Sequence, residues 1–159
     1  MGIQDLLDRW QAFVFRDVTF SDLKKGLEET FPHAIASDLL TTVGRGCGQR
    51  SCSRLMEEHG LKSRPDVLRR IAEIKEEERW GEFDFSEIEF EKLAGKVIVR
   101  KSFEARNFGP SKYTVCDFVR GYLSGFLSKL LDQRILIEET KCIARGDGLC
   151  EFNLVKVES

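Results

Sequence analysis

The 159-residue sequence lacks a long hydrophobic run, an excess of either charge and a dinucleotide-binding glycine fingerprint. No apolar stretch approaches the roughly eighteen residues that a membrane span needs. The net charge of −2 gives no basic surface for nucleic acid or for an anionic membrane. The start, MGIQDLLDRW, is acidic where a secretory signal is basic and then apolar. We therefore expect a cytoplasmic protein with no nucleic-acid or membrane partner.

Cysteine is present in an odd number. The five positions are Cys47, Cys52, Cys116, Cys142 and Cys150. Disulfide frameworks are rare in a reducing compartment, so the count favours metal ligands, reactive thiols or small core residues. These alternatives have to be separated by the positions of the cysteines.

The first half of the sequence predicts helices. An apolar stripe over residues 3–14 (Ile3, Leu6, Leu7, Trp10, Val14) indicates the first, and a second runs from near Ser21 to just before Pro32. From His33 a third carries a stripe at four-residue spacing, made of Ile35, Leu39, Val43 and Cys47. Its glycines at 44, 46 and 48 indicate either close backbone packing or a break. Ser63 and Asp66 form a capping pair for a fourth helix.

The second half predicts a sheet and one long helix. Residues 83–90 alternate with a slip of phase that indicates a bulge or turn, and a β-branched strand follows Gly95. Residues 114–131 form an apolar helix, with Thr114 and Asp117 as a capping box and with Gly121 and Gly125 for close packing. Two last strands are closed by a turn over residues 145–148. We expect one α+β domain over 1–159, helical over 1–79, whose antiparallel sheet has helices packed on one face.

Cys142 and Cys150 flank this last turn, and Glu139 and Cys116 are the nearest further ligands. Glu139 and Cys142 would point to opposite faces of a regular strand, so they converge only if the strand ends or bulges near Thr140. Cys116, at the start of the long helix, would have its thiolate favoured by the helix N-terminus. Three thiolates and one carboxylate suit a closed four-coordinate zinc site. Buried cysteines beside a turn remain the alternative.

Residues 116–154, CDFVRGYLSGFLSKLLDQRILIEETKCIARGDGLCEFNL, resemble the 4-vinyl-reductase (hydrocarbon-binding) domain family. The resemblance covers roughly residues 80–157 and includes the sensory domains of phenol-responsive activators. It implies that Cys116, Glu139, Cys142 and Cys150 bind zinc. It also implies the fold of the vesicle-tethering TRAPP subunits, an antiparallel sheet backed by helices and usually dimeric.

The resemblance favours a homodimeric sensor or carrier for a small apolar or aromatic molecule. Pocket candidates among the aromatic residues are Phe83, Phe85, Phe90, Phe103 and Tyr122, with Trp80 and Phe108 nearby. The family name invites an alternative, an enzyme or an accessory subunit of a reductase, although no nicotinamide or flavin site is visible.

Cys47 and Cys52 suggest a further alternative, thiol-based redox sensing. The two cysteines lie about 140° apart on a continuous helix and cannot meet there. A break at the glycines would let them form a reversible disulfide or join a second metal site.

Overall fold

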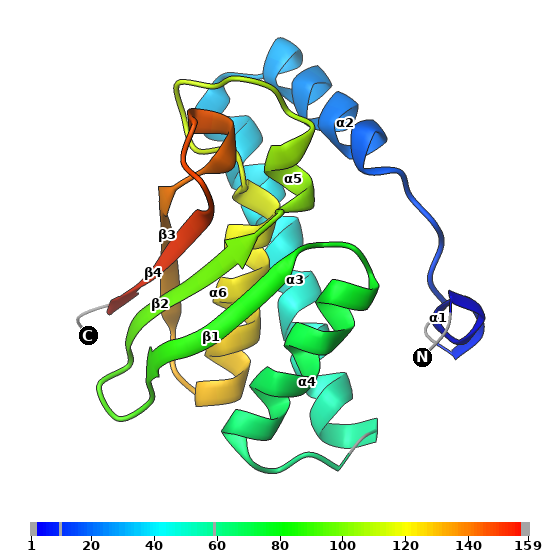
Figure 1. The fold of residues 1–159 in the computed structure, drawn as a ribbon, viewed down its shortest axis with the longest axis vertical. Helices are drawn as coiled ribbons and strands as arrows, with labels where there is room; N and C mark the ends of the chain where they lie inside the picture. Colours follow the sequence, from blue (N-terminus) through cyan, green and yellow to red (C-terminus); the bar gives the residue numbers. More distant parts are fainter. Residues whose placement is uncertain (1–2, 10, 59, 157–159) are drawn as a thin grey trace.

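The computed structural model describes residues 3–9, 11–58 and 60–156 (Figure 1). The helices are α1 (Ile3–Arg9), α2 (Asp17–Thr30), α3 (His33–Glu58), α4 (Arg64–Glu77), α5 (Phe103–Arg106) and α6 (Asp117–Leu131), with a 3-10 turn η1 (Ile143–Arg145). The strands are β1 (Glu82–Glu89), β2 (Ala94–Arg100), β3 (Ile135–Lys141) and β4 (Cys150–Lys156). No helix in this described part is long and apolar enough to cross a bilayer.

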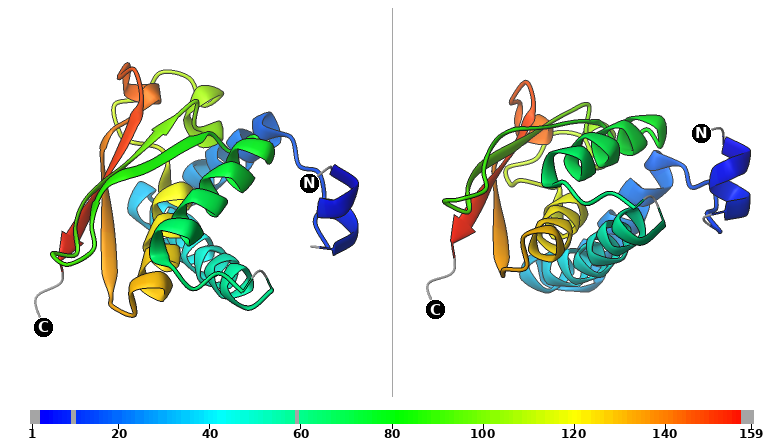
Figure 2. Two further views of the ribbon diagram at one scale, coloured as in Figure 1. Left: turned by 60° about the horizontal axis from the view of Figure 1, so that its bottom comes forward. Right: turned by 90° about the horizontal axis from the view of Figure 1, so that it is seen from below.

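The strands form one antiparallel sheet in the order β1-β2-β4-β3. Its register shifts between Asp84 and Glu87, where the sequence predicted a slip, and again between Glu139 and Lys141. Figure 2 shows α6 lying against one face of the sheet and α3 packing behind α6. The predicted α+β fold, with helices on one face of an antiparallel sheet, is confirmed.

Helix α6 is buried on nearly all sides because it lies between the sheet and α3. Its side chains at Val119, Tyr122, Leu123, Phe126 and Leu127 are fully buried. A helix that is apolar all round is expected in such a central position. The strong hydrophobic pattern of residues 114–131 therefore marks the centre of the core.

Glycines make the contact between α3 and α6. A Cβ added at Gly44 or Gly48 would lie 2.2 or 2.0 Å from a backbone oxygen of α6. A Cβ at Gly121 or Gly125 would lie 2.1 or 2.0 Å from a backbone oxygen of α3. Each helix thus presents two glycines to the backbone of the other. Of the two sequence alternatives for the glycines of α3, close packing is the one observed, and the helix is unbroken.

We expect Gly48→Ala to lower the free energy of unfolding by about 1–3 kcal/mol, because the two helices must separate to admit the methyl group. Gly26 is the matched control, since it is exposed within α2 and an added Cβ meets nothing within 4 Å. Gly26→Ala should instead stabilise by about 0.5–1 kcal/mol. Urea unfolding of both variants tests this, and equal effects would contradict the packing role of Gly48.

The helix starts and ends correct several predictions. The helix expected over 3–14 ends at Arg9, and Val14 lies beyond it, while Trp10 and the side chains of Ile3 and Leu6 lie outside the described residues. Helix α2 begins at Asp17, before the predicted Ser21. The predicted cap of α4 is confirmed, because the Ser63 hydroxyl accepts the backbone N–H of Asp66 at 3.2 Å.

The apolar stripe predicted for α3 does not face the core. Ile35, Leu39 and Val43 are 48%, 45% and 60% exposed. The buried face of α3 is instead formed by small residues and one leucine, namely Ala36, Leu40, Gly44 and Gly48. The helix turns its least bulky face inward because only that face can approach α6 so closely.

Candidate metal centre

Cys116, Glu139, Cys142 and Cys150 come together from three separate parts of the fold. Cys116 immediately precedes α6, and Glu139 lies on β3 at the shift of register. Cys142 follows the end of β3, and Cys150 is the first residue of β4. The predicted condition for convergence, a strand that bulges and ends near Thr140, is therefore met.

The distances among the four residues suit a single ion. One sulfur or carboxylate oxygen from each residue lies within 4.8 Å of all the others. The sulfurs of Cys116 and Cys150 are 3.7 Å apart. Two sulfurs bound tetrahedrally to one zinc at about 2.3 Å would lie about 3.8 Å apart. The observed spacing matches that geometry.

Glu139 presents an oxygen that has no other role. Its Oε2 accepts the backbone N–H of Cys116 at 2.9 Å, which fixes the carboxylate. Its Oε1 is buried and has no hydrogen-bond partner within the described residues. Leaving a buried carboxylate oxygen unsatisfied costs free energy unless a cation meets it. This orphan oxygen is the observation that most favours a bound metal.

Neighbouring groups orient the cysteines. The Ser102 hydroxyl lies 3.4 Å from the sulfur of Cys116, and the backbone N–H of Ile143 donates to the sulfur of Cys150. Asp147 in the last turn accepts the backbone N–H of Cys142 at 2.9 Å. Such surrounding hydrogen bonds hold metal ligands in place.

The charges in the cluster also call for a cation. Burial, followed by the neighbouring Cys142, raises the pKa of Glu139 to about 9. Burial raises the pKa of the Cys116 thiol far above its usual range, although the sequence predicted that the helix N-terminus would favour its thiolate. Hydrogen bonds from Cys116 and Cys150 lower the pKa of Cys142. The site therefore carries one thiolate readily, and a metal has to displace the remaining protons as it binds.

The start of α6 is held by residues that the sequence did not point to. Thr114 is not the cap, because the residue before the helix is Cys116 and its side chain makes no capping bond. The buried carboxylate of Glu104, from α5, accepts the backbone N–H groups of Phe118 and Val119 at 3.0 Å each. A distant carboxylate thus does the work predicted for a local cap.

Lys24 of α2 reaches the same place and is fully buried. Its ammonium lies 2.6 Å from Asp117 and 3.8 Å from Glu104, and it donates to the backbone oxygen of Val115. Burial alone would lower the pKa of Lys24, but Glu104 and Asp117 raise it above its ordinary value. The ammonium therefore offsets two buried carboxylates directly beside Cys116.

The predicted pocket aromatics separate into two groups. Phe103 and Tyr122 lie around Trp80, with ring centroids 5.3 and 5.1 Å away. Phe20 and Phe118, which were not among the candidates, complete this cluster. Phe83 and Phe85 stack on each other along β1, and Phe90 lies beside Arg64 at the end of β1. The Tyr122 hydroxyl is fully buried, near Ser51, without a hydrogen bond of ordinary geometry.

Cys47 and Cys52 lie apart from the metal cluster on the unbroken α3. The helix break that an internal disulfide requires is absent. Burial raises the pKa of Cys52 to about 11, so this thiol is protonated at neutral pH. Cys47 is half-buried.

Comparison with known families decides how to interpret this geometry. The profile of the vinyl-4-reductase domain matches residues 96–156, which include all four residues of the cluster. Residues 96–156 form a vinyl-4-reductase domain. The resemblance to the 4-vinyl-reductase family is thereby confirmed.

Relatives by sequence include two curated proteins. An uncharacterized protein of Methanocaldococcus jannaschii is 28% identical over 120 residues, covering 76% of the chain and 64% of that protein. The phenol regulator MopR of Acinetobacter guillouiae is 38% identical over 55 residues, covering 32% of the chain and 10% of MopR. The chain thus spans less than two thirds of either relative.

Solved structures of vinyl-4-reductase and TRAPP proteins share the fold. The phenol-responsive sensory domain of the activator PoxR with phenol has a TM-score of 0.78 at 21% identity, over 90% of this chain and 75% of that one. TRAPP subunit 3 of Naegleria fowleri, covalently bound to palmitic acid, has a TM-score of 0.68 at 16% identity, over 89% and 93%. A vinyl-4-reductase family protein of Methanocaldococcus jannaschii has 0.58 at 18% identity, over 75% and 68%. These likenesses confirm the predicted TRAPP-like fold.

Proposed function

We propose that this vinyl-4-reductase domain protein is a zinc-containing sensor or carrier of a small aromatic or apolar molecule. The buried, unpartnered Oε1 of Glu139 beside three cysteines carries the metal part of the proposal. The kinship with MopR and PoxR, whose names and titles refer to phenol, supports the ligand part. The reductase and redox alternatives stay predictions.

Zinc is the metal that this ligand set favours. Thiolates select soft or borderline ions, and three sulfurs with one oxygen suit a tetrahedral zinc site. With four protein ligands, zinc would have no open position for an activated water. Its role would be to tie the start of α6 to the hairpin of β3 and β4. Glu139, as a weaker ligand than a thiolate, would be the first to let go.

The cluster around Trp80 is the proposed ligand region. It is apolar, aromatic and central, and the Tyr122 hydroxyl within it has no hydrogen-bond partner of its own among the described residues. A phenol hydroxyl placed beside Tyr122 would satisfy that group. Entry of a ligand requires the packed rings to move apart.

Tyr122→Phe should therefore have two effects of opposite sign. Without ligand the protein should gain up to about 1 kcal/mol of stability, because an unsatisfied buried hydroxyl is removed. The affinity for phenol should fall about tenfold, because a hydrogen bond to the ligand is lost. Thermal unfolding and calorimetric titration with phenol measure the two effects.

Tyr113→Phe is the matched control, since Tyr113 is 62% exposed and stacks on His33. It should change neither quantity. Unchanged phenol affinity in Tyr122→Phe, or no phenol binding by the parent, would contradict the ligand site.

The exposed apolar stripe of α3 supports the proposed homodimer. Ile35, Leu39 and Val43 are spaced by four residues and face away from α6, so a second copy could cover them symmetrically. Native mass spectrometry of freshly purified protein tests metal, ligand and oligomeric state together. We expect a dimer with one zinc per chain, and a metal-free monomer would overturn both proposals.

A further inference from the structure

We propose that the protein has a second binding site, which takes the phosphate group of a small soluble molecule. The site is a hollow of about 410 Å³ at the C-terminal end of α6, between α3 and the start of β3. The metal cluster lies at the other end of α6, about 22 Å away along a helix of this length. The proposal is therefore independent of the metal and of the aromatic ligand region.

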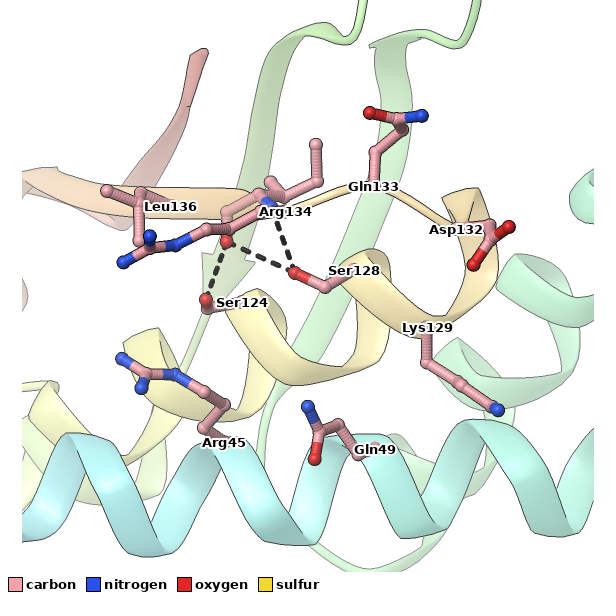
Figure 3. Close-up of a pocket in the computed structure, with 10 residues that line it drawn as sticks. Arg45, Gln49, Ser124, Ser128, Lys129, Asp132, Gln133, Arg134 and Leu136 are labelled. Atoms are coloured by element: carbon pink, nitrogen blue, oxygen red, sulfur yellow. Dashed lines mark hydrogen bonds between the residues drawn. The ribbon is translucent and has the colours of Figure 1, made fainter. Parts of the chain in front are cut away.

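The hollow is lined by basic and amide side chains. Arg45 and Gln49 come from α3, Lys129 from α6 and Arg134 from the turn before β3. Figure 3 shows the guanidinium groups of Arg45 and Arg134 extending toward the same end of the hollow from opposite walls. Asp132, the acidic residue of the lining, lies at the other end (Figure 3). Two like charges thus point to one space from elements far apart in sequence.

These cations have no internal counter-ion. Within the described part of the chain, no carboxylate lies within 4.0 Å of the charged groups of Arg45, Lys129 or Arg134. Two guanidinium groups facing one hollow repel each other unless an anion lies between them. The overall charge of −2 makes this local excess more distinct.

The backbone on both walls is fixed before any ligand arrives. The Ser124 hydroxyl donates to the backbone oxygen of Ile135 at 2.7 Å, and the Ser128 hydroxyl accepts the Ile135 N–H at 2.9 Å. These bonds anchor the residue that follows Arg134. On the other wall, the backbone oxygen of Arg45 packs against Gly125 in the contact between the helices. Anchored donors lose less freedom on binding, which favours affinity.

Phosphate is the anion that this arrangement fits best. The planar guanidinium fork binds phosphate oxygens with two parallel hydrogen bonds, and Lys129 adds a point charge. The volume lies within the range of about 300–1,000 Å³ typical of small-molecule pockets, so there is room for an organic group beyond the phosphate. A second hollow shares Gln49 and Lys129 with the first and adds Arg50, which extends the basic surface along α3.

Calorimetric titration of the full chain with glycerol 3-phosphate and with pyrophosphate, at constant ionic strength, tests the proposal. We expect saturable binding that weakens about tenfold or more in Arg45→Gln and in Arg134→Gln, because each removes a charge-assisted pair. The control Arg69→Gln, at an exposed residue of α4, should change the affinity less than about twofold. Metal content and the melting temperature should be the same in all three variants.

Several results would overturn the proposal. Neither probe binding saturably would do so, as would equal affinities in the parent and in the Arg45→Gln, Arg134→Gln double variant. Cosedimentation with vesicles containing phosphatidic acid distinguishes a lipid headgroup from a soluble phosphate. Sedimentation that depends on Arg45 and Arg134 but is not displaced by glycerol 3-phosphate would replace the small molecule by a membrane surface.

Discussion

Cys150→Ser is expected to release the metal and to lower the melting temperature by about 10 °C or more. The four ligands come from the start of α6 and from the terminal hairpin, so the site exists only in the folded chain. The free energy of metal binding is then part of the free energy of folding. A loss of roughly 5 kcal/mol gives a shift of this size in a chain of this length. Cys142→Ser should behave in the same way.

Metal analysis and thermal unfolding of matched variants check this result. Cys47→Ser removes a half-buried thiol outside the cluster and should keep the full metal content. Glu139→Gln should weaken binding yet fold when zinc is plentiful, because three thiolates remain. The assignment is wrong if Cys47→Ser strips the metal while Cys142→Ser and Cys150→Ser retain it.

Lys24→Met should lower the free energy of unfolding by about 3–5 kcal/mol. Removing the ammonium leaves Glu104 and Asp117 buried with less compensation, and breaking a buried ion pair at one partner has a cost of this size. The change should also loosen the start of α6, since Glu104 accepts the first N–H groups of that helix. Urea unfolding measures the effect.

Lys25→Met is the control one residue away. Lys25 is exposed, so its replacement should change stability by less than about 0.5 kcal/mol. Similar losses in the two variants would mean that the buried ion pairs contribute nothing special, and would refute the proposed role of Lys24.

The metal cluster could be found from the sequence because its chemistry is local to a few residue types. Cys142 and Cys150 bracket a glycine-rich turn, and Cys116 opens the strongest helix of the chain. The odd spacing of Glu139 from Cys142 even required the irregularity that β3 shows. The antiparallel sheet and the apolar helix α6 followed from equally strong patterns.

The surroundings of the cluster could not be found in this way. Lys24 lies in a polar stretch and reads as a surface residue, because its burial depends on Asp117, which is 93 residues later. The orientation of α3 was missed for a related reason. Hydrophobicity favours Ile35, Leu39 and Val43 as the inner face, whereas the closest approach of two helices selects glycine and alanine. Such choices depend on the partner surface, which no single segment encodes.

The glycine contact between α3 and α6 has a mechanical consequence. Since no side chains lie between the two backbones at Gly48 and Gly125, no intervening layer can rearrange to absorb a shift. A displacement of α3, imposed for example at its exposed outer stripe, carries α6 along as one rigid body. Cys116 travels with the end of α6, whereas Cys150 stays with the sheet. A metal joining these two cysteines would then act as a tether that limits how far the helix pair can slide.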